Sequence, residues 1–444
     1  MFKNFEIIEV MIPDIRINLR NKHSLFYYGW VIVAVSFLTI FLVLGTRSSF
    51  GLFYAAILQE YGWSRAETAG AFSLMMIIHS MTAPMTGILI DCLGPRMLFP
   101  LAALFLTIGL ATSSFISQMW HFYICVGVVM AIGTNMLSYA PHMSLIPRWF
   151  SKKKGLASGL VLSGIGLGTL AMALLNGFII NTLGWRQAFL ILGAIIFFIV
   201  IPVNAIFQRS SPKEIGQGFE NLQLGSNQPS NAQAKNNQSP SSLNGSIDYW
   251  SFKTALRTIS FWSLNATGFF QGFYYNTIVI HLAVYILDTG FSSMLAASSI
   301  GIVGLLTSVG GIILGLLSDR MGREKAGLFG CGSAVFGIIL LLFIRESSSV
   351  LLVYVLVISY GLGQGGMMSI TAATTGDLFS GGALGRIMSM QSVTFGFGSA
   401  LGVYLGGHFY DRYESYIVTF IMVLIAIILS YIFIWIAAPR KAIA

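Results

Sequence analysis

One positive charge stands inside the first long apolar run of the chain. The run extends from Leu25 to Leu58, and its only charged residue is Arg47. At about 1.5 Å of rise per helical residue, Arg47 lies roughly 16 Å from Leu58 and roughly 26 Å from Trp30 along the helix. An arginine at such a depth in a bilayer costs at least about 2.5–3.5 kcal/mol. We therefore expect its side chain to face a water-filled cavity or a counter-charge.

The chemistry that a lone guanidinium supports is the binding of an anion. Its planar fork can hold a carboxylate through two parallel hydrogen bonds, and a cavity that contains it has a positive potential. The aspartates and glutamates fall in tails, loops or ends of apolar runs, so an acidic cage for a cation is not expected. The alternative is that Arg47 bonds to backbone carbonyls or extends to the membrane surface.

Four histidines also lie within or at the end of apolar runs, and histidine titrates near neutral pH. They are His79, His142, His281 and His408. If the protein moves protons, we expect His142 or His281 to carry them. The alternative for each is an imidazole that only bonds to a neighbouring helix.

The elements that must position these residues are membrane-spanning helices. The chain is 55% hydrophobic and 9% charged, whereas soluble domains carry about 25% charged residues. Twelve runs are long enough to cross about 30 Å of hydrocarbon. They lie near residues 27–56, 68–91, 97–117, 121–143, 154–180, 187–207, 259–287, 294–318, 326–344, 349–374, 385–409 and 415–437.

The charge distribution predicts the orientation. Of the 25 Lys and Arg residues, 20 fall on the side of the N-terminus and four on the opposite side. The positive-inside rule then places both termini in the cytoplasm, and we expect a cell membrane, namely the bacterial inner membrane. This asymmetry also explains the net charge of +9 without a nucleic-acid partner.

Nothing in the sequence indicates catalysis or a cofactor. The three cysteines lie in apolar runs or at the end of one, which favours neither disulfides nor a metal site. There is no phosphate-binding loop and no nucleophile motif. We therefore expect no enzyme activity, no metal and no cofactor.

The apolar pattern divides the chain into two halves. We expect a cytoplasmic tail over 1–24, a six-helix bundle over 25–207, a second bundle over 257–437 and a tail over 438–444. Residues 208–256 are rich in Asn, Gln, Ser and Gly, which predicts a flexible linker between the halves.

The two halves repeat a short motif. GILIDCLGPRML, from Gly87, and GLLSDRMGREKA, from Gly315, are 228 residues apart, and a second match links Phe150 to Phe379 at an offset of 229. Asp91 and Asp319 could cap a neighbouring helix or pair with Arg96 or Arg323, and such contacts could hold one face of the protein shut in one state and break in the other. The alternative is a plain turn with solvated charges. The predicted gating residues are Gly87, Asp91, Gly94, Arg96, Gly315, Asp319, Gly322 and Arg323.

With these motifs, the chain resembles the major facilitator superfamily over nearly its whole length. GWSRAET at Gly62 and RWFSKKKGLASG at Arg148 make it similar to the branch of monocarboxylate transporters and oxalate–formate exchangers. The resemblance implies an all-α fold of two pseudo-symmetric six-helix bundles, alternating access, and transport of small carboxylates, often with a proton. It also implies a substrate role for Arg47. Helix 8 of this chain, at 294–318, contains no ionisable side chain, unlike common members of that branch.

In this superfamily, helices 1, 4, 7 and 10 line the central cavity. Their polar residues are therefore candidates for substrate contact, with Tyr139 and Asn276 favoured; each could instead serve helix packing. The resulting substrate-binding set is Arg47, Asn135, Tyr139, His142, Tyr275, Asn276, His281 and Gln364. Gln271, Tyr274 and Tyr360 belong to the same helices.

Together these features predict a secondary active or facilitative transporter for a small organic anion, a monocarboxylate, that works as a monomer in the lipid bilayer. Proton symport, exchange and uniport all stay open. The first alternative is an exporter of a neutral or amphiphilic compound. A second is a transporter-like receptor that signals through residues 208–256.

Overall fold

The computed structural model describes residues 27–150, 153–215, 251–344, 349–379 and 384–437. Within these ranges every regular element is a helix, as predicted. The tails at 1–24 and 438–444, and the centre of the predicted linker at 216–250, lie outside the described residues. Both ends of that predicted linker are described, and each contains a short helix: the 3₁₀ helix η3 (Pro212–Ile215) and α11 (Phe252–Ala255).

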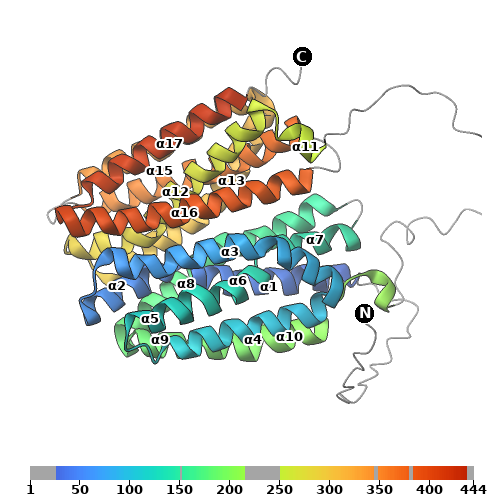
Figure 1. The fold of residues 1–444 in the computed structure, drawn as a ribbon, viewed down its shortest axis with the longest axis horizontal. Coiled ribbons are helices and arrows are strands. Elements are labelled where there is room, and N and C mark those ends of the chain that lie inside the picture. The colour runs from blue at the N-terminus through green and yellow to red at the C-terminus, as the bar shows by residue number, and fades with distance from the viewer. Residues whose placement is uncertain (1–26, 151–152, 216–250, 345–348, 380–383, 438–444) are drawn as a thin grey trace, which may run out of the picture.

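The helices of the N-terminal half correspond to the first six predicted spans. The half runs from blue to green in Figure 1. Its elements are α1 (Gly29–Ser48), α2 (Phe50–Tyr61), α3 (Arg65–Leu93), α4 (Pro95–Ser113), α5 (Met119–Phe122), the π-helical turn η1 (Tyr123–Met130), α6 (Ala131–Met136), α7 (Tyr139–Trp149), α8 (Lys154–Leu183), α9 (Trp185–Ile195), η2 (Ile196–Val200) and α10 (Ile201–Phe207).

The C-terminal half, yellow to red in Figure 1, supplies the other six spans. They are α12 (Ile259–Asp288), α13 (Ser293–Met321), α14 (Arg323–Leu342), α15 (Val350–Leu378), α16 (Leu384–Tyr413) and α17 (Ile417–Ala437).

The predicted spans agree with these helices to within six residues. The largest difference is at the end of the fourth span, predicted at residue 143 and observed at Trp149. Eleven helical segments of the described chain are long and apolar enough to cross a membrane. The remaining one, α16, is 30 residues long but carries Arg386, Asp411 and Arg412 near its ends, and it packs against α3 and α12 between the two halves.

The two bundles lie side by side (Figure 1). We distinguish the two ends of the protein by the helices that begin or stop at each. We call the end where α10 stops and α12 begins the linker side; α7 and α11 mark it in Figure 1. We call the opposite end, where α2 stops and α3 begins, the far side.

Two of the spans are interrupted, which the sequence analysis did not predict. The first span breaks at Ser49, between α1 and α2, and the fourth breaks at Leu137 and Ser138, between α6 and α7. At Ser49 a bond from another span holds the break, because Asn176 Nδ2 on α8 donates to Ser49 Oγ at 2.6 Å. Interrupted spans near the centre of a transporter commonly mark the substrate site.

The repeated motif forms the same turn in both halves. Gly94, between α3 and α4, has φ +72°, and Gly322, between α13 and α14, has φ +92°. These angles favour glycine because a side chain would be strained there. Gly87 and Gly315 lie one turn or more before the ends of α3 and α13; an added Cβ would meet no atom within 4 Å at Gly87, and at Gly315 only Ser369 Cβ at 3.7 Å.

Glycines in α8 and α16 let helices approach closely, but most of these contacts lie within one half. Gly168 packs on the Phe41 carbonyl of α1, and Gly398 packs on the Phe269 carbonyl of α12. Four glycines do face the opposite half: Gly166 and Gly177 of α8 meet Ser308 and Ala297 on α13, and Gly396 and Gly407 of α16 meet Ser80 and Arg65 on α3. The seam between the halves is therefore lined by glycines on both α8 and α16.

Candidate functional site

Arg47 lies in the last turn of α1, two residues before the interruption at Ser49. Its Nη1 is 3.3 Å from Nε2 of His79 on α3. In the described part of the chain, no carboxylate forms an ion pair with Arg47, and its electrostatic neighbours are Tyr139 on α7 and Tyr275 on α12. All four side chains are at least partly accessible, with Tyr139 46% exposed. The guanidinium thus has neutral neighbours and accessible surface, as the sequence analysis expected for an anion site.

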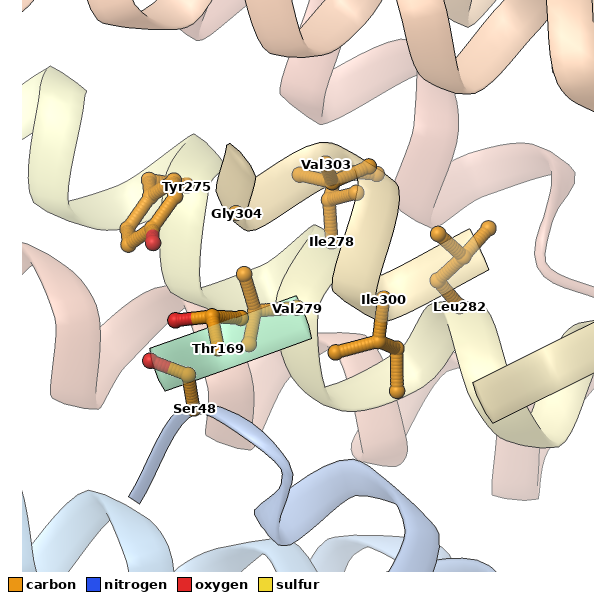
Figure 2. A pocket seen from close by; sticks show the side chains of 9 residues that line it. All are labelled: Ser48, Thr169, Tyr275, Ile278, Val279, Leu282, Ile300, Val303 and Gly304. Atoms are coloured by element: carbon orange, nitrogen blue, oxygen red, sulfur yellow. The ribbon is translucent and has the colours of Figure 1, made fainter. Parts of the chain in front are cut away.

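A narrow pocket near Arg47 lies between α1, α8, α12 and α13 and is lined by Ser48, the next residue along the chain, and by Tyr275; in this structure it has no room for a water molecule. Figure 2 shows three hydroxyl groups at one end of it, those of Ser48, Thr169 and Tyr275. The other end is aliphatic. Its lining residues are Ile278, Val279, Leu282, Ile300, Val303 and Gly304. The pocket spans both halves and offers hydrogen-bond donors next to a hydrocarbon wall.

The predicted amide candidates bind neighbouring helices in this structure. Asn135 donates to Thr82 and Thr86 on α3, at 2.8 and 3.0 Å, and Asn276 donates to Ser399 on α16 at 2.8 Å. These three bonds join spans and favour the packing alternative for Asn135 and Asn276. Gln271 likewise bonds to α15, through Met367 and Thr371.

Gln364 differs from the other amides. It lies on α15 with no exposed surface, and neither its Oε1 nor its Nε2 has a hydrogen-bond partner among the described residues. Tyr360, one turn earlier, donates to the Tyr274 carbonyl of α12 at 3.3 Å. Tyr360 is also an electrostatic neighbour of Tyr275, which in turn neighbours Arg47.

Neither histidine predicted as a proton carrier contacts Arg47 in the described contacts. His142 is fully buried with its ring 4.3 Å from that of Phe99, and neither of its nitrogens has a described partner. His281 is also buried; its Nε2 lies 2.9 Å from the Val403 carbonyl and its Nδ1 lies 3.2 Å from the Tyr416 hydroxyl. The histidine that does meet the guanidinium, His79, was noticed in the sequence but not assigned a role.

A polar group on the far side joins the two halves, and the sequence analysis missed it. Arg65, at the start of α3, forms an ion pair with Asp288 of α12 at 2.7 Å and donates to the Tyr416 hydroxyl at 2.7 Å. Its guanidinium also lies 3.4 Å above the Tyr410 ring. Asp411 of α16 accepts from the backbone N–H groups of Arg65 and Ala66, both at 2.8 Å.

We call these residues, Arg65, Asp288, Tyr410, Asp411 and Tyr416, the far-side cluster. A signal was present, because Asp288 and Asp411 end two spans and Arg65 begins another. Sequence spacing could not show that these three ends meet.

The predicted gating charges on the linker side pair within each half. Asp91 bonds to Arg148 at 2.8 Å, whereas Arg96 donates to the Ala205 carbonyl at 3.0 Å. Asp319 pairs with Arg323. Arg323 also reaches Asp377 of α15 at 2.8 Å.

Comparison with known proteins agrees with this architecture. The sequence pattern of the Major Facilitator Superfamily matches residues 36–371 and 338–443. Monocarboxylate transporter 13 of Rattus norvegicus is 25% identical over 89% of this chain and 85% of its own length. Monocarboxylate transporter 11 of Homo sapiens is 26% identical over 93% of this chain and 83% of its own.

Among solved structures, the fold is similar to a bacterial homolog of the human lysosomal transporter Spinster, described as inward-facing and occupied. The TM-score is 0.68 at 14% identity, over 94% of this chain and 97% of that chain. Together with the family match over most of the sequence, this shows the fold. The chain belongs to the major facilitator superfamily, is related to the monocarboxylate transporters, and is a multi-pass membrane transporter rather than an enzyme.

Proposed function

We propose that this protein carries a small organic anion, a monocarboxylate, across the membrane by alternating access, and that the carboxylate docks on Arg47. The observation that carries the proposal is a guanidinium without a carboxylate partner among the described residues, beside an interrupted span and a pocket shared by both halves. Binding to such a guanidinium is charge-assisted and bidentate.

The residues that line the pocket suit a substrate with one charged end and one apolar end, which would enter when the two halves move apart and widen it. The hydroxyls of Ser48, Thr169 and Tyr275 lie at its polar end, where they could complete the hydrogen bonds of the carboxylate (Figure 2). The aliphatic end fits a hydrocarbon tail better than a second charge, because burying an unpaired carboxylate is costly. Tyr139 completes the proposed set on the α7 side. The relatives named monocarboxylate transporters support the same substrate class.

The far-side cluster supports a state that is closed on the far side. It joins α3 of one half to α12 and α16 of the other. With the termini in the cytoplasm, as the Lys and Arg distribution favours, this state would face inward. We propose a cell-membrane location, and we assign the motif residues Gly87, Asp91, Gly94, Arg96, Gly315, Asp319, Gly322 and Arg323 to the linker-side turns that move as parts of each half.

A second candidate function is export of a neutral or amphiphilic compound. The observation that favours it is that six of the nine residues lining the pocket are aliphatic or glycine, and α13, which borders the pocket, has no ionisable side chain over residues 294–318.

The test uses Arg47→Gln, which keeps hydrogen-bonding capacity and removes the charge. Truncating one partner of a buried charge pair costs about 2–5 kcal/mol, so we expect affinity for straight-chain carboxylates of one to six carbons to fall at least about 30-fold. Thermal shift measures binding, because a ligand stabilises the state it binds, and uptake into proteoliposomes measures transport.

Arg186→Gln is the matched control, because that arginine pairs with Glu60 at the protein surface within the N-terminal half. Unchanged carboxylate binding and uptake in Arg47→Gln would contradict the proposal. Stabilisation by neutral amphiphiles, with none by carboxylates, would favour the exporter.

A further inference from the structure

The contact between Arg47 and His79 fixes the protonation of the imidazole. An arginine N–H can only donate a hydrogen bond, so Nε2 of His79, 3.3 Å from Nη1 of Arg47, must accept. Its lone pair is then directed at the guanidinium, and the ring proton sits on Nδ1. In this arrangement the histidine is neutral, and the site carries one positive charge, that of Arg47.

A second proton on His79 is disfavoured while this contact lasts. It would place an imidazolium directly against a guanidinium, and like charges at hydrogen-bond distance repel strongly where water is scarce. The only described charged group that faces His79 is Arg47 from α1. Tyr139 of α7 and Tyr275 of α12 add phenolic hydroxyls near Arg47.

The elements packed against α3 around this position offer no compensating acid. The nearest described side-chain contacts from α6 and α16 are neutral: Asn135 bonds to Thr82, and Gly396 lies against Ser80. Among the described residues no Asp or Glu interacts with either member of the pair.

A bound carboxylate removes both reasons that His79 stays neutral, namely the charge of Arg47 and its hydrogen bond to Nε2. It cancels the charge of Arg47 and draws its N–H groups into the bidentate pair, which frees the Nε2 lone pair. His79 is partly accessible, so a proton from water can then bind to Nε2. With anion, guanidinium and imidazolium together, the loaded site has a net charge of +1, the same as the empty site.

We propose that His79 is the proton-binding residue of this transporter, and that it takes up one proton for each anion that Arg47 binds. The inference rests on the proposed function, because it needs an anion at Arg47. It replaces the expectation that His142 or His281 carries the proton. Both nitrogens of His281 are engaged in the far-side contacts, and His142 is fully buried against Phe99.

The variant that tests this is His79→Gln. Its amide oxygen can accept from Arg47 as Nε2 does, but it cannot be protonated. His408→Gln is the matched control, because His408 is an exposed histidine that stacks on Tyr404 of its own helix. Both variants remove one titratable imidazole from a membrane span.

The first measurement is carboxylate affinity between pH 6 and pH 8, with L-lactate as the first probe. If one proton binds with the anion, linkage requires wild-type affinity to weaken by up to about tenfold per pH unit. We expect the same slope in His408→Gln and a flat profile in His79→Gln. A wild-type slope in His79→Gln would overturn the proposal.

The second measurement separates proton movement from anion movement in proteoliposomes that contain a trapped pH dye. L-lactate added outside should acidify the lumen through the wild type and through His408→Gln. His79→Gln should lose this acidification but still exchange internal for external labelled lactate, because exchange needs no net proton transfer.

The failures of the two proposals are distinguishable. If carboxylates bind to the wild type but acidification persists in His79→Gln, only the role of His79 is overturned. If binding to the wild type does not change with pH, the role of His79 is overturned as well. If no carboxylate of one to six carbons binds to the wild type, both this inference and the anion function fail.

Discussion

The two ends of the protein use their charged residues in different ways. On the far side, Arg65 of the N-terminal half contacts Asp288 and Tyr416 of the C-terminal half, and Asp411 caps α3 from across the interface. On the linker side, the ion pairs described join helices of one half only, as Asp91 and Arg148 do. The ion pair of Arg65 with Asp288 on the far side joins the two bundles, whereas those described on the linker side join helices within one bundle.

Under the proposed alternating-access function, this difference indicates which contacts must break during transport. In alternating access, each bundle moves largely as a rigid body, so contacts within a half can persist while contacts between halves must form and separate. The energy of the far-side cluster therefore sets the balance between states. The linker-side pairs set the stability of each bundle instead.

The linker-side pairs also show how the repeat has been modified. Arg148 and Asp377 are 229 residues apart, the offset of the second sequence match, and each pairs with a residue of the repeated turn: Arg148 with Asp91, and Asp377 with Arg323. Only one partner keeps its place: Arg148 and Asp377 are equivalent, but the partner in the turn changes from Asp91 to Arg323, four residues after Asp319, the counterpart of Asp91.

Arg65→Ala is expected to change the ratio of far-side-open to far-side-closed protein more than any other substitution considered below. The change removes an ion pair, a hydrogen bond and a ring contact that all join the halves, together worth about 3 kcal/mol. The ratio of far-side-open to far-side-closed protein should rise about 100-fold. Spin labels at Gln118 and Arg412, both exposed on the far side, would report a longer distance.

Arg186→Ala is the control for that measurement. It removes an arginine at the same end whose partner, Glu60, belongs to the same half. An equal lengthening in both variants would mean that the far-side cluster does not set the state.

A smaller effect is expected at the seam between the halves, from Gly396→Ala. An added Cβ would come within 1.5 Å of Ser80 Oγ and 2.7 Å of Ser80 Cβ, and overpacking of this kind costs about 1–3 kcal/mol. Because α3 and α16 belong to different halves, the change should favour far-side opening by about tenfold. Ser80→Gly should restore much of the balance.

Gly402→Ala is the matched comparison, because its Cβ would meet the Phe273 carbonyl of α12, within the same half. We expect a lower melting temperature without a change in the spin-label distance. If α16 instead moved with the N-terminal half, Gly402→Ala would change the spin-label distance and Gly396→Ala would only lower the melting temperature. That result would require a different division of the bundles.

The structural features that could be predicted from the sequence are those that depend on residues close together in the chain. The spans follow from apolar runs, and the turns at Gly94 and Gly322 follow from a repeated local motif. Arg47 was found because a charge in an apolar run is visible without knowing any partner. Residues 208–256 could be separated from the spans by composition alone.

The parts that could not be predicted depend on how distant helices meet. His79 is 32 residues from Arg47, and the contact depends on the rotation of α3 relative to α1, which side-chain packing sets. Asp411 caps a helix that begins 346 residues earlier. The interruption at Ser49 is held by Asn176 from another span, so no local signal marked it.

The smallest effect is expected from Asp91→Asn on the linker side. Asp91 is 68% exposed and its partner Arg148 is 36% exposed, and solvated pairs of this kind contribute about 0–1 kcal/mol. Because both residues belong to the N-terminal half, the melting temperature should fall by a few degrees at most. The spin-label distance and carboxylate uptake should keep their wild-type values.

That expectation separates two roles for the repeated motif. If the turn only holds α3 to α7, Asp91→Asn and Asp377→Asn should each lower stability slightly and independently, with additive effects, because the two pairs share no residue. If the motif instead locks the linker side when the far side opens, either change should slow transport while leaving the far-side-closed protein as stable as before. Uptake rates measured beside melting curves distinguish these outcomes, and slowed transport at unchanged stability would show that the linker side also forms contacts between the halves.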